Sequence, residues 1–550
     1  MRIKQKRGLQ FYCRLAVCIT FSVLLIIYFI QVLPTPEVEV LYVEDICLMP
    51  SINVDQKVIQ YVNHELPRVE CKRGVPPYVR QKSNTLSRIL FKYINTTYLS
   101  CCYSKLVNRY GKLSADNYCK AFGKEIEVNT TYARVLCTYK NRLVYEDYFM
   151  FPPKANPKSK QKKPVLNRYN VLMLGLRAVS RINAYRIMSK FTNYLRYGLS
   201  AVEFSKYNAI NFDTVHKESL RNIVPLYTGM TYEDVLEAYT RQALDSRDFI
   251  WNRFKQEGYK ILLGEDCINE GIFRHKFLSK NIIADYSILP FMDIYENNTG
   301  NLANDGCYLC ASSKLTYKII LDYYLTLAGF MRDSREKHFA MLWLNSLAVT
   351  NNPRRGINMP GIAVNDLKDF FYSLKRRGFL DDTIVFVISD RGYISTELNL
   401  IPQFVNEAKQ PLLYISLPKQ MKNRRANMAE KLKINTNKLV NAFDVHKTLE
   451  TIMKLDTKTL KSKQPNPRKR TQGISLFNTV PHRFCYNIGI NANACACKYI
   501  AKYVPKKIIK KVKTRYAAVL LKSQPSDKRC RIISLSFQKE IEKQTHQAYI

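Results

Sequence analysis

Short apolar runs alternate with longer segments of helical spacing through the middle of the chain, and this alternation limits the fold more than any other feature. Each run is bounded by Gly, Asp or Pro. Strands that alternate with helices build a mostly parallel sheet covered by helices on both faces. We therefore predict a doubly wound α/β core over residues 166–456. The apolar runs cover residues 171–176, 260–263, 339–344, 383–388 and 412–417.

An apolar segment near the amino terminus predicts a membrane anchor. Residues 15–33 carry no charge, and this length is close to the ~20 residues that a helix needs to cross a bilayer. Basic residues precede the segment and acidic residues follow it, so the positive-inside rule places residues 1–14 in the cytosol and the rest in a lumen or outside the cell. A cleaved signal peptide is the alternative, but no small-residue cleavage site follows the run. We predict a single-pass signal anchor with type II topology.

Cysteines gather in two clusters beyond this segment, one before residue 140 and one near the end. In an oxidising compartment such clusters form disulfides that stabilise small modules. We predict a disulfide-braced N-terminal module over residues 34–150, a basic linker over 151–165, and a basic, Cys-containing region over 457–550. The disulfide candidates are Cys47, Cys71, Cys485, Cys495, Cys497 and Cys530.

Three Asn-x-Thr sequons, at Asn95, Asn129 and Asn297, agree with a secretory route. Together with the apolar segment and the cysteines they predict a glycoprotein of the Golgi or cell-surface membrane. Most of the chain would then be lumenal or extracellular, and a protease could release it.

The net charge of +41 narrows the possible partners. Such an excess first suggests nucleic acid, but no nucleic-acid-binding motif accompanies the basic residues, and a lumenal protein rarely meets DNA. We expect sulfated glycans or other anionic ligands instead, and no nucleic acid. Solvated loops are the plainer interpretation of each separate basic run.

The apolar run at 383–388 ends in Ser389-Asp390-Arg391-Gly392, one of several short motifs that occur in a fixed order along the chain. With Asn170–Arg181, Asn222–Gly229 and Ala442–Leu449, this stretch resembles the animal family called domain of unknown function 229, a branch of the alkaline-phosphatase-like superfamily of phosphatases and sulfatases. Further matches are Gly264–Asp266, Trp343–Leu347, Arg483–Cys485, Cys495–Cys497 and the pair Cys47 and Cys71. The resemblance spans roughly residues 45 to 530 and implies an alkaline-phosphatase-like fold.

The resemblance also implies a catalytic site. Active members of the superfamily use two divalent metals such as zinc, held by carboxylates and histidines at strand ends, to activate a Ser or Thr nucleophile. Ser219 falls at the nucleophile position, and Asp390, Asp444 and His446 fall at metal positions. Alternatives remain, because Ser219 could be a helix N-cap and a lone His near a helix start is often structural.

Four other ligand positions have changed. Arg177 stands where the family has its first metal-binding Asp, Arg391 replaces the His of the Ser-Asp-His-Gly motif, and Val349 and Thr350 replace a further His and Asp. Arginine stays protonated and offers no lone pair to a metal. We therefore expect no metal cofactor.

These replacements predict an inactive phosphatase- or sulfatase-like protein in which Arg177 and Arg391 bind an anion. Each arginine could instead pair with a nearby acid, such as Arg391 with Asp266. Two other functions stay open: an ester hydrolase with Ser219 as its nucleophile, and a cationic adhesion or scaffold protein.

Overall fold

The computed structural model describes residues 47, 49, 56–63, 69–71, 77–89, 96–109, 112–153, 168–212, 218–279, 283–304, 306–348, 350, 352–455 and 473–497. The predicted anchor at 15–33 lies outside these residues, as do Asn95, Val349 and Cys530. Within the described ranges no helix is both long enough and apolar enough to cross a membrane.

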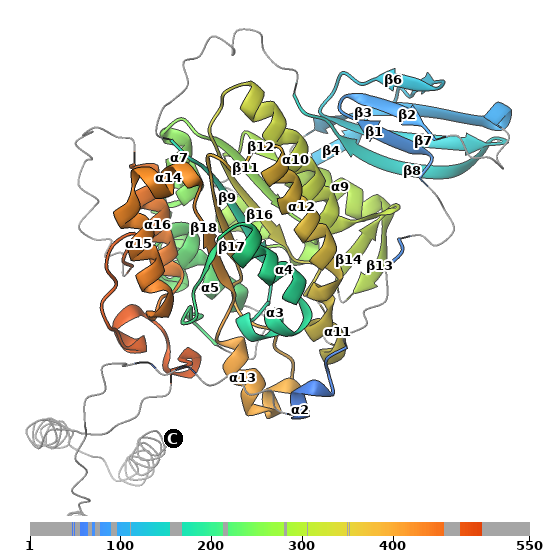
Figure 1. Cartoon of the computed structure of the whole chain (residues 1–550). Helices are drawn as coiled ribbons and strands as arrows, with labels where there is room; N and C mark the ends of the chain where they lie inside the picture. Colours follow the sequence, from blue (N-terminus) through green and yellow to red (C-terminus); the bar gives the residue numbers. More distant parts are fainter. Residues whose placement is uncertain are drawn as a thin grey trace, which may run out of the picture. The chain divides into compact units, whose positions relative to one another are not determined.

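A seven-stranded sheet forms the core of the chain (Figure 1). Five neighbouring strands are parallel, whereas β18 runs antiparallel to both of its neighbours. The prediction of a mostly parallel α/β core is confirmed, with an antiparallel strand near one edge. In spatial order the strands are β10 (Val202–Glu203), β18 (Leu413–Ser416), β17 (Thr383–Ile388), β9 (Asn170–Leu176), β16 (His338–Leu344), β11 (Lys260–Glu265) and β12 (Tyr286–Ser287).

Helices pack on both faces of this sheet, because alternate residues of its central strands point to opposite sides. Leu172 and Leu174 of β9 lie in one apolar cluster, with α10 (Thr316–Asp333) and α12 (Val364–Arg376). Val171 and Met173 lie in the other, with α5 (Glu218–Thr228), α7 (Ile250–Gln256) and α16 (Ala442–Met453). Every residue of β9, β16 and β17 is buried, which explains why these strands are continuous apolar runs in the sequence.

The register of the strands brings their carboxyl ends together. Gly175 of β9 lies opposite Trp343 of β16 and Ile388 of β17, and Trp343 lies opposite Glu265 of β11. Residue 175 must be glycine, because a Cβ there would lie 1.1 Å from the Trp343 ring. The polar residues that follow these four strands therefore share one edge of the sheet.

An antiparallel sheet makes up most of the region before the core. It comprises β3, β4, β5, β7 and β8, and a smaller sheet of β1, β2 and β6 accompanies it. The disulfides Cys101–Cys137 and Cys102–Cys119 lie within this N-terminal module. The strands are β1 (Val79–Lys82), β2 (Thr85–Arg88), β3 (Leu99–Arg109), β4 (Lys112–Ala115), β5 (Lys120–Phe122), β6 (Glu125–Glu127), β7 (Tyr132–Tyr139) and β8 (Arg142–Met150).

Three further disulfides include cysteines outside this module. Cys71 pairs with Cys310 of β14 (Cys307–Ala311), so the N-terminal cysteine cluster does not close on itself as expected. Cys267 pairs with Cys307, and Cys485 pairs with Cys495. Cys47 and Cys497 each take part in a disulfide as well. This many disulfides indicates a protein of the secretory pathway or the cell exterior.

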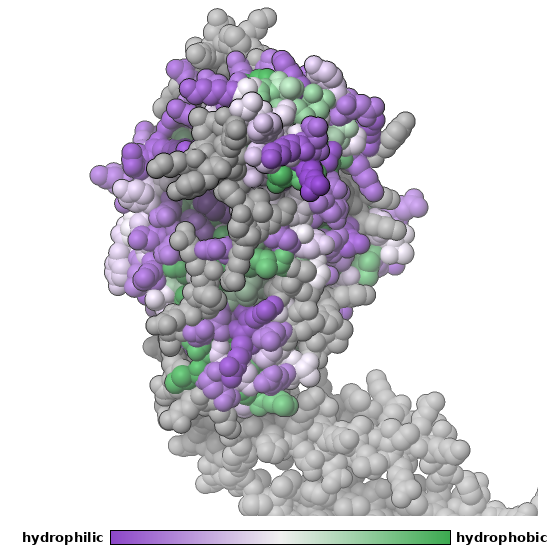
Figure 2. Space-filling view, turned by 90° about the vertical axis from the view of Figure 1, so that its right-hand side faces the viewer, coloured by the Kyte–Doolittle hydropathy of each residue, from purple (hydrophilic) through white to green (hydrophobic). Residues whose placement is uncertain are grey.

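Among the residues that Figure 2 colours, hydrophilic side chains predominate and hydrophobic ones form small patches. Asn129 is exposed in the segment that follows β6. Asn297 is also exposed, but it lies inside α9 (Leu289–Thr299), and the Thr299 hydroxyl of its sequon is buried and donates to the carbonyl oxygen of Tyr295 at 2.8 Å. The two described sequons therefore differ in how accessible they are.

Candidate functional site

Arg177, Asp390 and Arg391 meet where β9 and β17 end. The backbone turns sharply after Arg177, with Ala178 at φ +55°, and the Ala178 N–H donates to Asp390 Oδ1 at 2.9 Å. Asp390 is buried, and its other oxygen, Oδ2, lies 3.9 Å from Arg391 Nε. The structure thus brings three of the sequence-predicted site residues to one sheet edge.

The half-buried Arg177 guanidinium connects this edge to the loop after β11. Its Nη1 donates to the carbonyl oxygen of Glu270 at 2.8 Å. Burial lowers the pKa of Arg177, the negative charges of Asp390, Glu270 and Glu265 oppose that change, and the positive charge of Arg391 adds to it. The two arginines therefore lie within electrostatic reach of each other.

Two carboxyl groups at the end of β11 are fully buried. Glu265 accepts hydrogen bonds from the N–H groups of Ile272 (2.8 Å) and Phe273 (3.0 Å), and burial raises its pKa to about 7. Asp266 accepts from the backbone N–H and the hydroxyl of Ser346, after β16, and burial raises its pKa as well. Asp266 thus bonds to the end of β16, and the ion pair of Arg391 is with Asp390 instead.

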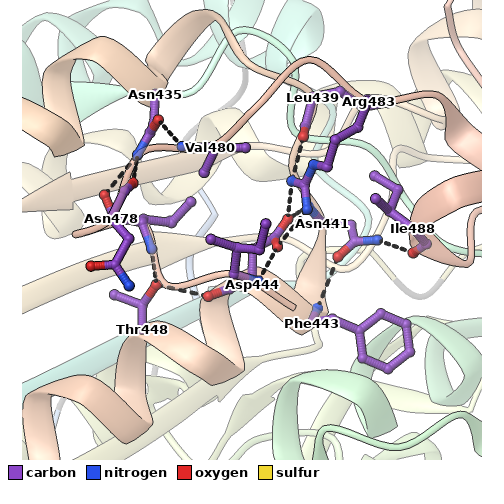
Figure 3. A network of polar contacts seen from close by, with 12 residues as sticks. Asn435, Leu439, Asn441, Phe443, Asp444, Thr448, Asn478, Val480, Arg483 and Ile488 are labelled. Carbon is purple, nitrogen blue, oxygen red and sulfur yellow. Dashed lines mark hydrogen bonds and ion pairs between the residues drawn. The ribbon is translucent and has the colours of Figure 1, made fainter. Parts of the chain in front are cut away.

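Asp444 lies in a dense polar network at the start of α16 (Figure 3). Its carboxylate accepts both Nη1 (3.0 Å) and Nη2 (2.7 Å) of Arg483 and the backbone N–H groups of Asn441 (2.9 Å) and Ile474 (2.8 Å). Asp444 has an exposed fraction of 0% and Arg483 of 8%. Both oxygens of this carboxylate are therefore occupied by protein donors.

The imidazole of His446 contacts α5 and its own helix, α16. Its Nδ1 lies 3.0 Å from the carbonyl oxygen of Leu226 on α5, and its Nε2 lies 3.5 Å from Glu450 Oε1 on its own helix. Gly229, at φ +68°, packs directly on the ring, since a Cβ there would lie 2.7 Å from Cδ2. His446 thus joins α16 to α5.

Ser219 lies in the first turn of α5, directly after residues 213–217, which the structure does not describe. Its hydroxyl is buried and makes no hydrogen bond within the described part of the chain. Among the described residues no hydrogen bond or ion pair joins Ser219 to Arg177 or Arg391. Asn222 on the same helix accepts from the N–H groups of Ile210 and Asn211, each at 2.9 Å, and so fixes the loop before α5.

Sequence reasoning missed two further groups near this edge. Burial and the charges of Glu265 and Asp390 raise the pKa of Tyr227 on α5 well above its usual value, and within the described residues its buried hydroxyl makes no hydrogen bond. Lys409 Nζ lies 3.5 Å from the carbonyl oxygen of Cys495 and 5.5 Å from the Phe212 ring centre, and burial lowers its pKa. Neither residue stands in a motif that would have marked it.

The family model described as "Protein of unknown function (DUF229)" matches residues 64–538, which is most of the chain. This chain is a member of the DUF229 family. The match includes residues 64–150 of the N-terminal module, the core and the C-terminal segment with Arg483. No curated protein matched the chain.

Several solved structures resemble parts of this DUF229 protein. One is the lipoteichoic acid synthase LtaP from Listeria monocytogenes, at 14% identity and a TM-score of 0.39, covering 59% of this chain and 82% of that one. Another is an alkaline phosphatase superfamily protein from Vibrio parahaemolyticus, at 16% identity and a TM-score of 0.31, covering 48% and 67%. The periplasmic domain of EptC from Escherichia coli, in complex with zinc, has 9% identity and a TM-score of 0.37, covering 60% and 98%.

The described residues of this DUF229 protein do not fit a pair of divalent metals. Arg177 and Arg391 place cations at two strand ends, and both oxygens of Asp444 already accept from Arg483. Within the described residues, the group of three or more potential ligands that lie close enough to share an ion is Cys485, Cys495 and Cys497. The first two of these form a disulfide, so this group does not fit a metal either.

Proposed function

We propose that this protein is a non-catalytic member of its family that binds an anion at the carboxyl edge of the sheet, through Arg177 and Arg391. The observation that carries the proposal is the placement of two arginines at adjacent strand ends around one buried aspartate: Arg391 pairs with Asp390, and the charge of Asp390 also acts on Arg177. Guanidinium groups match phosphate, sulfate and carboxylate oxygens well, because each presents a planar set of N–H donors.

The local charge balance supports an anionic ligand. Asp390 neutralises one arginine. Glu270 and Glu265 act on the other arginine, Arg177, and the pKa of Glu265 is raised to about 7, so that this carboxyl is only partly ionised at neutral pH. A bound anion would reduce the repulsion between the two guanidinium groups.

The first experiment separates this function from hydrolysis. The purified full-length protein should contain no stoichiometric zinc and should not hydrolyse an aryl phosphate or aryl sulfate. Stoichiometric zinc, or hydrolysis that Ser219→Ala abolishes, would instead establish an esterase with Ser219 as its nucleophile.

The second experiment tests the anion site itself. Titration with inorganic phosphate and with sulfate should show binding that weakens by roughly 10- to 100-fold in Arg177→Gln and in Arg391→Gln, since a hydrogen bond to a charged group contributes about 1.5–3 kcal/mol. Arg241→Gln is the matched control, because Arg241 is 73% exposed and pairs with Glu237 away from the strand ends. Equal affinity in all three variants would assign the binding to general surface charge and overturn the proposal.

We also propose that residues 15–33 anchor the protein in a membrane of the secretory pathway. The uncharged length of this segment and the basic residues before it support the anchor. Alkaline carbonate washing should leave the full chain in the membrane pellet and should release a variant with two Lys substitutions at the middle of the segment. Release of the unmodified chain would contradict the anchor.

A further inference from the structure

A cavity of about 480 Å³ lies between the N-terminal module and the core, away from the strand-end site. The module contributes one wall through β1 and β8, including Val79 and Met150. The core contributes the other wall through α9, the turn before α10, and α10 itself, including Phe291 and Ile319. Its volume is within the usual range for small-molecule sites, which often lie between structural units of one chain.

The two walls are fixed to each other by covalent and polar contacts. The disulfide Cys71–Cys310 joins the segments on either side. The Ser312 hydroxyl donates to the carbonyl oxygen of Glu146 at 2.7 Å, and the Tyr132 hydroxyl donates to that of Ser287 at 3.0 Å. The cavity is therefore preformed, so a ligand would not have to order its walls.

The floor of the cavity is apolar. Val79, Met150, Phe291, Ile319 and Tyr323 all have exposed fractions of 8% or less. A ligand that reaches this floor needs an apolar body, because polar groups buried without partners cost free energy.

Among the described residues, each charged side chain that lines the cavity has an ion-pair partner except that of Arg80. Lys314 pairs with the buried Asp147 at 2.9 Å and lies 4.1 Å from the Phe149 ring centre, and Asp322 pairs with Lys318 at 3.4 Å. Arg80 on β1 is exposed and has no ion-pair partner within the described residues. The uncompensated charge at the cavity is therefore positive.

We propose that this cavity binds a small amphipathic anion, with its apolar body on the floor and its acidic group on Arg80. The apolar floor selects the body, and Arg80, the cavity-lining cation without an ion-pair partner among the described residues, selects one negative group. This site does not depend on the anion site at the strand ends.

The test uses 1-anilinonaphthalene-8-sulfonate, which combines an apolar body with one sulfonate, on the full-length protein. Its fluorescence should rise on binding, and Arg80→Glu should weaken binding about 10-fold or more. Lys82→Glu is the matched control, because Lys82 is exposed on the same strand but does not line the cavity. Ser313→Trp, in the turn at the cavity wall, should abolish binding by filling the space, and unfolding midpoints check that each variant folds.

Three comparisons can overturn the proposal. Equal losses in Arg80→Glu and Lys82→Glu would show that net charge alone attracts the probe. Equal affinity for uncharged N-phenyl-1-naphthylamine would remove the anion from the proposal. Displacement of the probe by a sulfated oligosaccharide but not by decanoate would assign the cavity to glycans, whereas displacement by decanoate alone supports the amphipathic class.

Discussion

Substitution of Arg483 by methionine should lower the free energy of unfolding, because the Asp444–Arg483 pair stabilises the fold and does not bind a metal. The change removes two hydrogen bonds to Asp444 and one to the carbonyl oxygen of Leu439 at 2.6 Å, and it leaves the Asp444 charge buried. Removal of one partner of a buried ion pair costs about 3–5 kcal/mol. Because two backbone N–H groups still bond to Asp444, we expect a loss near 3 kcal/mol.

Denaturant unfolding followed by tryptophan fluorescence measures this loss directly. The chain has two tryptophans, and both Trp251 and Trp343 are buried in the core, so the signal reports core unfolding. Arg247→Met is the matched control. Arg247 pairs with Asp245, but its side chain is 69% exposed, so its loss should leave the unfolding midpoint almost unchanged.

A double-mutant cycle tests whether the pair acts as a unit. The double variant Asp444→Leu with Arg483→Met should lose at least about 2 kcal/mol less unfolding free energy than the two single variants lose in sum. The reason is that the double variant leaves no unpaired charge buried. A loss below 1 kcal/mol for Arg483→Met would refute the structural role of the pair. So would an Asp444→Asn variant that loses bound zinc while its unfolding midpoint stays unchanged.

Three further predictions concern other parts of the chain. Burial raises the pKa of Glu296 from 4.5 to about 8, so its contribution to stability is complete below pH 4.5 and is lost as the pH rises through 8. The unfolding free energy should therefore fall by about 1.4 kcal/mol per pH unit between pH 4.5 and 8. In Glu296→Gln, the plot of unfolding free energy against pH should lose that slope. An unchanged slope in this variant would refute the raised pKa of Glu296. Asn129→Gln should remove a glycan detected by mass shift whereas Asn297→Gln should not, since Thr299 of its sequon is buried in a helix; a shift in the second variant alone would reverse this order. Gly175→Ala should yield little folded protein in an expression and solubility assay, because its Cβ would overlap the Trp343 ring, and normal yield would contradict that packing.

The sheet was predictable because its central strands are buried on both faces. Residues 171–176, 339–344 and 383–388 contain no polar alternation, and such runs indicate interior strands without further information. The antiparallel direction of β18 was not predictable from its run at 412–417, since a strand's composition does not encode its direction.

The candidate site was only partly predictable, because its key contacts join residues far apart in the sequence. Arg177 and Arg391 follow strands that the sequence locates, so their shared edge could be expected. The partner of Asp444 could not, since Arg483 lies 39 residues away, beyond a segment that the structure does not describe. Arg483 stands in the Arg-Phe-Cys motif, and that motif was the available signal.

The disulfide between Cys71 and Cys310 sets an order of events during synthesis. Its two cysteines are 239 residues apart, and a ribosome adds about 5–20 residues per second, so Cys71 waits roughly 12–48 s for its partner to emerge. During that interval six other cysteines are made, and each is a possible wrong partner for the waiting thiol: Cys101, Cys102, Cys119, Cys137, Cys267 and Cys307. Cys101 and Cys137 face each other on neighbouring antiparallel strands, so pairing of these two strands brings their thiols together without any contribution from Cys310.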